Sequence, residues 1–312
     1  MIITKYGKVV KGLGGLYDTR VVENGEVTVY SCRAKGILKR DEEKVLIGDN
    51  VKILIDDETP DGLVISEILE RKNSLIRPPM ANLDYLFIVF ASKKPTPVLE
   101  TIDKLISIAV YNGIVPVIVI TKSDLDSGTA DELASIYNKV GIDTFVTSSE
   151  DMTGVAPLAE YISARVNNGL TAAFTGASGV GKSTLMNALF PNLSLATAEI
   201  SRKIERGRHT TRHVEIFDIN EDEDTGFLAD TPGFSLIDFA RFDFFSLEDV
   251  FSTFPEFKPY VGKCRYNDCA HVGEGADECA VMRAVKNGEI PESRLESYRS
   301  IYRVLKEKKH YD

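Results

Sequence analysis

The sequence predicts a multidomain α/β protein with an N-terminal OB-like β-barrel, a central domain with a mostly parallel sheet, and a C-terminal helical domain. Short alternating strands punctuated by glycines predict the barrel over residues 1–75. Apolar strands that alternate with amphipathic helices predict the sheet over 76–240. Irregular, helix-rich sequence with clustered cysteines fills 241–312. A chain of 312 residues is long enough for two or three domains.

The first 75 residues show the alternation of apolar and polar side chains that is typical of half-buried strands. Val27 and Val29 alternate with polar neighbours, and so do Val51, Ile53 and Ile55. We expect a five-stranded oligonucleotide-binding barrel that binds RNA through a strand face and its loops. The alternative is a small β-domain that only packs on its neighbour.

A linker with paired prolines, residues 71–79, separates the barrel from the central domain. Apolar residues of the expected helix 99–111 recur at helical spacing and share one face. Strands that alternate with helices at this spacing predict parallel pairing with helices on both faces. The expected strands are 84–90, 114–120, 142–147 and 170–175, and the other expected helices are 130–140 and 155–166.

A glycine-rich turn with the pattern G-x-x-x-x-G-K-S joins the strand 170–175 to the next helix. Its glycines let successive N–H groups point at phosphate oxygens, beside the positive end of the helix. Lys182 adds a charge for the β- and γ-phosphates, and the Ser183 hydroxyl suits Mg²⁺. The motif therefore predicts a nucleoside triphosphate without identifying its base. The expected binding residues are Gly176, Ala177, Ser178, Gly179, Val180, Gly181, Lys182, Ser183 and Thr184.

Thr121, Lys122, Ser123 and Asp124 follow the strand 114–120, and ligands bind at such strand ends in parallel sheets. The Asp124 carboxylate can accept the ring N–H and the exocyclic amine of guanine, whereas adenine presents an acceptor at the first position. Lys122 can lie along the base. We therefore expect GTP, with a P-loop ATPase or small-molecule kinase as the alternative class.

Two serines follow the next strand, 142–147. Ser148 and Ser149 are expected to offer backbone N–H groups to the guanine oxygen. The end of the strand 142–147 would then hold the base from a second side.

The turn D-T-P-G after the short strand 227–229 is a candidate for magnesium and γ-phosphate binding. Asp230 is expected to hold Mg²⁺ through water, and Gly233 to present its N–H to the γ-phosphate. Ser183 and either Thr210 or Thr211 complete the expected magnesium set.

The two threonines belong to a basic segment, Ile200–His213, where a switch loop is expected. It carries five arginine or lysine residues against one glutamate. These charges either meet RNA phosphates or keep a long loop solvated.

The order of the motifs along the chain is unusual. In Ras-like GTPases the phosphate loop comes first, D-x-x-G second and the base-reading motif last. Here Asp124 precedes Gly176, and Asp230 follows both. This order predicts a circularly permuted P-loop GTPase domain, in which the same sheet is cut at a different loop.

Four metal-binding side chains lie within a short C-terminal stretch. Cys264, Cys269, His271 and Cys279 form C-x4-C-x-H-x7-C, a Cys₃His set suited to one tetrahedral structural Zn²⁺ per chain. The alternative is a set of buried free thiols.

Composition predicts a cytoplasmic protein that does not bind membranes. No apolar run reaches the roughly 18 residues of a membrane helix, and the N-terminus lacks a signal-peptide core. A net charge of -10 argues against a globally basic surface but permits local basic patches. We expect one such patch on the last helix, which begins near Pro291. Its basic side chains either bind RNA or are simply solvated. Its basic residues are Arg299, Arg303, Lys306, Lys308 and Lys309.

With its N-terminal β-domain, T-K-S-D, G-A-S-G-V-G-K-S-T, G-R-H-T-T-R, D-T-P-G-F and Cys/His cluster, the chain resembles the RsgA (YjeQ) family, the ribosome small-subunit-dependent GTPases of bacteria. The resemblance covers nearly the whole chain. It implies a late maturation factor that binds the small ribosomal subunit and its rRNA. It also implies ribosome-stimulated hydrolysis of GTP to GDP and phosphate. We expect a monomer; a scaffolding RNA-binding protein with a vestigial nucleotide site is the alternative.

The chain departs from the family pattern at two places. Many members have asparagine at the position of Thr121, and the shorter threonine predicts weaker base binding. The last gap of the cysteine cluster is also longer here than is usual in the family.

The catalytic residue cannot be the usual glutamine, because Phe234 follows D-T-P-G. Ras-like enzymes place a glutamine there to orient the attacking water. His209 in the basic segment is our candidate for this role, and the family resemblance suggests the same residue. We expect slow hydrolysis by the protein alone, and faster hydrolysis once the ribosomal subunit orders this segment.

Overall fold

The computed structural model describes residues 2–35, 44–56, 63–191, 214–219, 225–230 and 238–309. The chain divides into two compact units. The first contains residues 1–85, 157–175 and 186–234, and the second contains 86–156, 176–185 and 235–312. The predicted domain boundaries at residues 75 and 240 stay a prediction.

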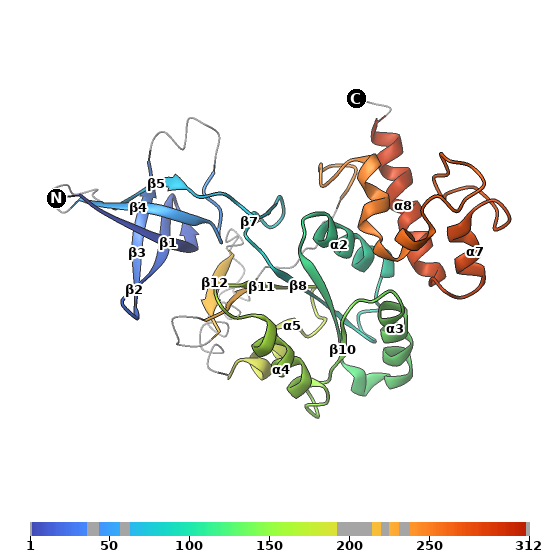
Figure 1. Cartoon of the computed structure of the whole chain (residues 1–312). Helices are drawn as coiled ribbons and strands as arrows, with labels where there is room; N and C mark the ends of the chain where they lie inside the picture. Colours follow the sequence, from blue (N-terminus) through green and yellow to red (C-terminus); the bar gives the residue numbers. More distant parts are fainter. Residues whose placement is uncertain are drawn as a thin grey trace. The chain divides into compact units, whose positions relative to one another are not determined.

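Five strands of the first unit close into a small barrel (Figure 1). Strand β1 pairs antiparallel with both β2 and β4. Strands β2 and β3, and strands β4 and β5, are also antiparallel pairs, whereas β3 and β5 pair in parallel. Val9, Val21, Ile53 and Ile65 are buried, as the alternation predicts. The barrel predicted from the sequence is confirmed. Its strands are β1 (Ile2–Leu13), β2 (Leu16–Glu23), β3 (Glu26–Ala34), β4 (Asn50–Asp56) and β5 (Leu63–Ile68).

The remaining strands of the first unit extend from the barrel. A short pair, β6 (Ser74–Leu75) and β7 (Met80–Ala81), follows it in the chain. Strand β11 (Thr171–Thr175) pairs in parallel with β13 (Phe227–Asp230), which pairs antiparallel with β12 (Glu215–Asp218). Lys11 of β1 stands in register with Glu215 of β12, so the barrel and these strands are continuous. Helix α4 (Val155–Arg165) precedes β11.

The second unit contains the strands β8 (Tyr85–Ala91), β9 (Val115–Thr121) and β10 (Thr144–Val146), with β9 and β10 parallel. Helices α2 (Leu99–Tyr111) and α3 (Ser127–Lys139) lie beside them (Figure 1). The predicted apolar face of α2 is buried, including Leu105 and Ile106. Helix α3 begins earlier than predicted, because the Asp126 carboxylate accepts a hydrogen bond from the Thr129 N–H at 3.1 Å and caps the helix.

The C-terminal part of the second unit consists of helices. They are η3 (Leu247–Thr253), η4 (Pro255–Tyr260), α7 (Ala280–Lys286) and α8 (Glu292–Lys309). The fully buried Arg294 of α8 donates to Asp103 of α2 at 2.6 Å and to Glu256 of η4 at 2.7 Å. Its guanidinium also lies 4.6 Å from the Phe254 ring centroid. This ion-pair cluster fixes α8 to α2. Among the helices described, none is long and apolar enough to cross a membrane.

Cationic side chains of the barrel join it to β11, β12 and β13 within the first unit. Arg20 donates to Asp218 at 2.9 Å, and Lys11 forms an ion pair with Glu215 at 2.9 Å. Lys8 donates to the Thr171 hydroxyl at 3.2 Å, and its ammonium lies 5.0 Å from the Phe227 ring centroid. Burial lowers the pKa of Lys8 to about 8, against smaller opposing effects from Asp84 and Asp49.

We expect the buried charge of Lys8 to destabilise the protein near neutral pH. Between about pH 8 and 10.5 the unfolded chain keeps this proton and the folded chain loses it, so the contribution of Lys8 to stability rises with pH in that range. Lys8→Met should therefore raise the denaturation midpoint at pH 7. Its advantage over the wild type should shrink as the pH rises from 8 to 10.5.

Chemical denaturation of both proteins across this range measures the difference. The matched control is Lys11→Met. The hydrogen bond to Glu215 raises the pKa of Lys11 above its ordinary 10.5, so the effect of this substitution should stay constant from pH 8 to 10. An advantage of Lys8→Met that does not change with pH would contradict the prediction.

Candidate nucleotide site and metal centre

The phosphate loop, residues 176–184, follows β11 and leads into helix α5 (Lys182–Leu189). Gly179 and Gly181 have φ angles of 79° and 95°, which side-chain-bearing residues rarely adopt. Ser183 and Thr184 are exposed in the first turn of α5. The strand, turn and helix predicted from the sequence are therefore present, and the positive end of α5 follows the turn.

The loop lies against the backbone of β8. A Cβ atom at Gly176 would stand 2.2 Å from the carbonyl oxygen of Val89 and 3.2 Å from the Val180 side chain. Only glycine allows this approach, because a distance of 2.2 Å to a backbone atom is a clash. The glycine thus sets the position of the loop relative to β8.

The loop predicted to read the base, Thr121–Asp124, stands at the carboxyl end of β9 as predicted and is called the base-reading loop below. Lys122 has a left-handed backbone with a φ of 57°, after which Ser123–Leu125 forms the short helix η1. Asp124 is exposed, and its carboxylate accepts a hydrogen bond of 2.7 Å from the Ser148 hydroxyl. That bond fixes the orientation of a side chain which would otherwise rotate freely.

Ser148 therefore has a part that the sequence analysis missed. We expected its backbone N–H to meet a base, but this N–H donates to Thr153 O at 2.9 Å. Of the two predicted backbone contacts with the guanine oxygen, only the one from Ser149 is still expected. A serine at the end of one parallel strand and an aspartate at the end of the next are neighbours in any such sheet. The contact between these two side chains could therefore have been predicted from the sequence.

The two loops are in direct contact. The Lys122 ammonium donates to Gly179 O at 2.6 Å, and the Thr121 hydroxyl donates to Val180 O at 2.5 Å. Two segments that the sequence assigns to one nucleotide therefore meet at one place in the second unit.

The turn between β8 and α2 supports the base-reading loop from another side, and the sequence analysis did not single it out. The Ser92 hydroxyl donates to Lys122 O at 2.8 Å, and the Lys122 ammonium donates to Lys94 O at 2.6 Å. Lys93 forms an ion pair with Asp126 at 3.2 Å. The sequence could have indicated this role by position alone, because Ser92 directly follows the buried strand β8.

Part of the predicted site lies outside the described residues, namely His209, Thr210, Thr211 and Gly233. Asp230 ends β13, where its backbone stands in register with Phe174 and Glu215. Its side chain is not described.

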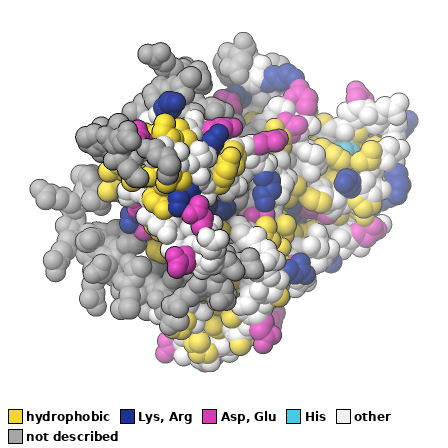
Figure 2. Space-filling model, turned by 60° about the vertical axis from the view of Figure 1, so that its left-hand side comes forward, with side chains coloured by type: hydrophobic (Ala, Val, Ile, Leu, Met, Phe, Trp, Pro, Cys, Tyr) yellow, Lys and Arg dark blue, Asp and Glu magenta, His cyan; other side chains and the backbone are white. Residues whose placement is uncertain are grey.

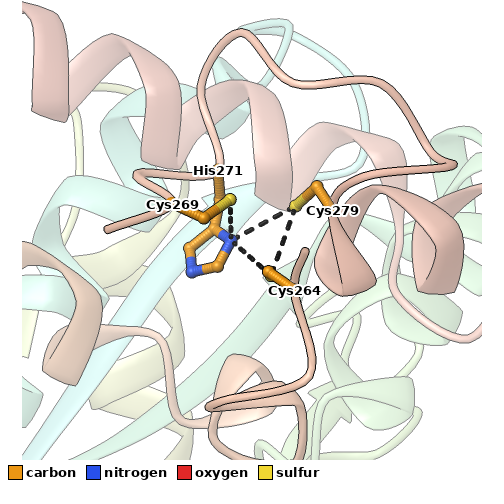
Figure 3. A group of neighbouring side chains, drawn as sticks. All are labelled: Cys264, Cys269, His271 and Cys279. Carbon is orange, nitrogen blue, oxygen red and sulfur yellow. Dashed lines mark hydrogen bonds between the residues drawn. The ribbon is translucent and has the colours of Figure 1, made fainter. Parts of the chain in front are cut away.

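Cys264, Cys269, His271 and Cys279 converge as predicted (Figure 3). Their ligand atoms all lie within 4.8 Å of one another. His271 Nδ1 is 3.6 Å from Cys264 Sγ, 3.4 Å from Cys269 Sγ and 3.2 Å from Cys279 Sγ, and the sulfur atoms of Cys264 and Cys279 are 4.0 Å apart. A tetrahedral zinc ion separates its sulfur and nitrogen ligands by roughly 3.5–3.8 Å. The cluster can therefore hold a zinc ion.

The surroundings of the cluster also suit a metal. Backbone N–H groups donate to two of the sulfurs, from Ala280 to Cys264 at 3.3 Å and from Met282 to Cys279 at 3.5 Å. Such donors stabilise thiolates. Burial lowers the pKa of His271, against an opposing effect of Glu274, and so favours the neutral imidazole that binds metals. With three thiolates and one imidazole, the donor set is that of a closed structural site.

The fold and the two loops together define the class of protein. A phosphate loop that follows its base-reading loop in the chain, each of them after a buried strand, is the arrangement of a circularly permuted P-loop GTPase. A solved structure described as YloQ, a circularly permuted GTPase, is similar to this chain with a TM-score of 0.75 and 29% identity, over 98% of this chain and 96% of that one.

The chain belongs to the RsgA GTPase family. The RsgA GTPase domain matches residues 68–240, and the RsgA N-terminal domain matches residues 6–64. YjeQ from Thermotoga maritima is similar with a TM-score of 0.76 and 32% identity, over 97% of this chain and 99% of that one. The small ribosomal subunit biogenesis GTPase RsgA of Alkaliphilus metalliredigens is 39% identical over 98% of this chain and 99% of that protein. The protein of that name from Bacillus subtilis is 35% identical over 97% and 98%.

We expect the purified protein to contain one zinc ion per chain, held by the Cys₃His cluster. Cys264→Ser removes one of the three thiolates and should abolish stoichiometric zinc and lower the thermal stability of the C-terminal helices, because binding of a structural metal contributes to folding. Elemental analysis of the dialysed protein measures the zinc content.

Cys32→Ser is the matched control, because Cys32 is also a free cysteine but lies buried in the barrel. This variant should keep its zinc. Full zinc content in Cys264→Ser would exclude the proposed ligand set.

Proposed function

We propose that this chain is a GTP hydrolase that binds the small ribosomal subunit and assists its late maturation. The observation that carries the proposal is the contact of the base-reading loop with the phosphate loop at Gly179 and Val180. Membership of the RsgA GTPase family supports GTP hydrolysis, and the names of its relatives support the ribosomal partner.

In this proposal the two loops bind opposite ends of one nucleotide. Asp124, oriented by Ser148, accepts the N1–H and N2–H groups of guanine. The amides of residues 176–184 and the Lys182 ammonium surround the phosphates, and Ser183 and Asp230 hold Mg²⁺. In this arrangement the carboxylate selects the base and the phosphate loop binds the phosphates.

For hydrolysis we propose that His209 orients the attacking water and that Thr210 or Thr211 completes the magnesium site. The family pattern and Phe234 in the place of a glutamine support this assignment. Gly233 would present its N–H to the γ-phosphate and move when that phosphate leaves.

An exposed aromatic residue of the barrel supports contact with rRNA, in addition to the basic segment Ile200–His213. On the face drawn in Figure 2, side chains of both charges are interspersed with hydrophobic ones. On the barrel, Tyr6 is 59% exposed and stands in register with Lys52, whose ammonium lies 3.8 Å from the Glu67 carboxylate, and an exposed aromatic ring suits an unpaired base. Two lysines of the basic patch on α8, Lys308 and Lys309, form ion pairs with acidic residues of this chain. We propose that the barrel and the basic segment contribute more to RNA binding than that patch.

We expect GTP hydrolysis by the protein alone to be slow and to rise by on the order of tenfold or more with purified small ribosomal subunits, because the subunit orders the catalytic segment. Phosphate release with and without subunits measures this, and ATP is the competitor that tests the base. Release that subunits do not stimulate, or that ATP inhibits as strongly as unlabelled GTP does, would contradict the proposal.

Two variants test GTP binding and catalysis separately. Lys182→Ala should lose GTP binding, because the ammonium meets the β- and γ-phosphates. His209→Ala should bind GTP as the wild type does and lose about a hundredfold in stimulated turnover. Unchanged stimulated turnover in His209→Ala would remove this histidine from the mechanism.

A further inference from the structure

The hydroxyl of Thr121 is directed into the protein. Thr121 is 3% exposed, and its Oγ1 lies 2.5 Å from Val180 O and 3.2 Å from Phe90 O. Both neighbours are carbonyl oxygens, which only accept hydrogen bonds. The single hydroxyl proton is therefore committed to the protein backbone, and the shorter distance assigns it to the phosphate loop.

This geometry determines what Thr121 can do to a bound base. The guanine edge away from Asp124 presents the acceptors N7 and O6. A hydroxyl has one proton, so Thr121 has none left to donate to N7 or O6 while the bond to Val180 exists. An asparagine at this position would have two N–H groups and could serve both partners.

We infer that Thr121 is a positioning residue that ties the base-reading loop to the phosphate loop and makes no contact with the base. The inference rests on the proposed function, because it assigns a role within the proposed GTP site. The tie sets the distance between the carboxylate that selects guanine and the amides that bind phosphate. One nucleotide then spans both without a rearrangement of either loop.

Both ends of the tie are held by their neighbours. On one side, Thr121 O accepts a hydrogen bond from Ser92 N–H at 2.9 Å at the end of β9. On the other side, Val180 is buried and packs beside Gly176, where a Cβ would stand 3.2 Å from Val180 Cγ2. A Cβ at Gly181 would come within 3.8 Å of the Thr121 hydroxyl, so the phosphate loop passes directly over it. Because both partners are held in place, this hydrogen bond fixes the position of the phosphate loop relative to the base-reading loop.

The tie and a contact to N7 predict different effects of removing the hydroxyl. Loss of the tie misplaces the phosphate loop and weakens every purine nucleotide that Asp124 accepts by the same factor. Loss of a contact to N7 weakens only nucleotides that have N7. The probe is 7-deaza-GTP, in which a C–H group replaces N7.

The experiment measures the affinity of the full chain for GTP and for 7-deaza-GTP in the wild type, Thr121→Val and Thr121→Ser. Thr121→Val should weaken both nucleotides equally, by about three- to tenfold, the effect of one hydrogen bond. Thr121→Ser keeps the hydroxyl and should bind both within about twofold of the wild type. Thr101→Val, at an exposed position of α2, is the control for replacing a threonine and should change nothing.

Two results would overturn the inference. One is Thr121→Val that binds GTP as tightly as the wild type. The other is Thr121→Val that weakens GTP and leaves 7-deaza-GTP unchanged, which would place the hydroxyl on N7. If Thr121→Val does not fold, Thr121→Ala gives the same comparison without adding a methyl group. Wild-type protein that binds no GTP would contradict the proposed function instead, so the two failures are distinguishable.

Discussion

The contact between the base-reading loop and the phosphate loop is the constraint on which the proposed site depends. Two backbone carbonyls, of Gly179 and Val180, accept hydrogen bonds from Lys122 and Thr121. These partners are far apart in the chain, and each loop follows the carboxyl end of a buried strand, where ligands bind in α/β folds. Circular permutation changes the order of the strands along the chain and leaves this meeting point intact. The glycines of the phosphate loop then allow the backbone to come close enough for the bonds to form.

The C-terminal helices are joined to the rest of the second unit by polar interactions as well as by apolar packing. Arg294 is buried between Asp103 and Glu256, and removing Arg294 would leave two buried carboxylates without a counter-charge. The Cys₃His cluster organises a stretch that otherwise has short helices and turns, as zinc does in small domains with little core. Helix α8 is thus anchored on α2, and the Cys₃His cluster anchors the segment that precedes it.

Much of the fold could be predicted from the sequence, because periodicity and glycine placement encode it locally. The barrel strands, the helices α2 and α8, the phosphate loop and the metal cluster follow the expected pattern. The parts that were missed depend on contacts between distant residues. The role of the Ser148 hydroxyl depends on where Asp124 points, and the supporting turn at Ser92 depends on which loops share one end of the sheet. Thr121 is the clearest case. From the sequence, a threonine in the place of asparagine indicates weaker base binding, whereas in the structure its proton is used within the protein.

The most direct test of the account exchanges the hydrogen-bonding pattern of residue 124 and of the base together. Asp124→Asn replaces one carboxylate oxygen by an N–H donor, which suits xanthine, where a carbonyl stands in place of the guanine amine. The measurement is the affinity of wild-type and Asp124→Asn protein for GTP and for XTP. We predict that the affinity of the variant for GTP falls by about a hundredfold and that its affinity for XTP rises by a similar factor, because each mismatch leaves polar groups unpaired. A variant that binds GTP as tightly as the wild type does, with no gain for XTP, would show that the base is read elsewhere.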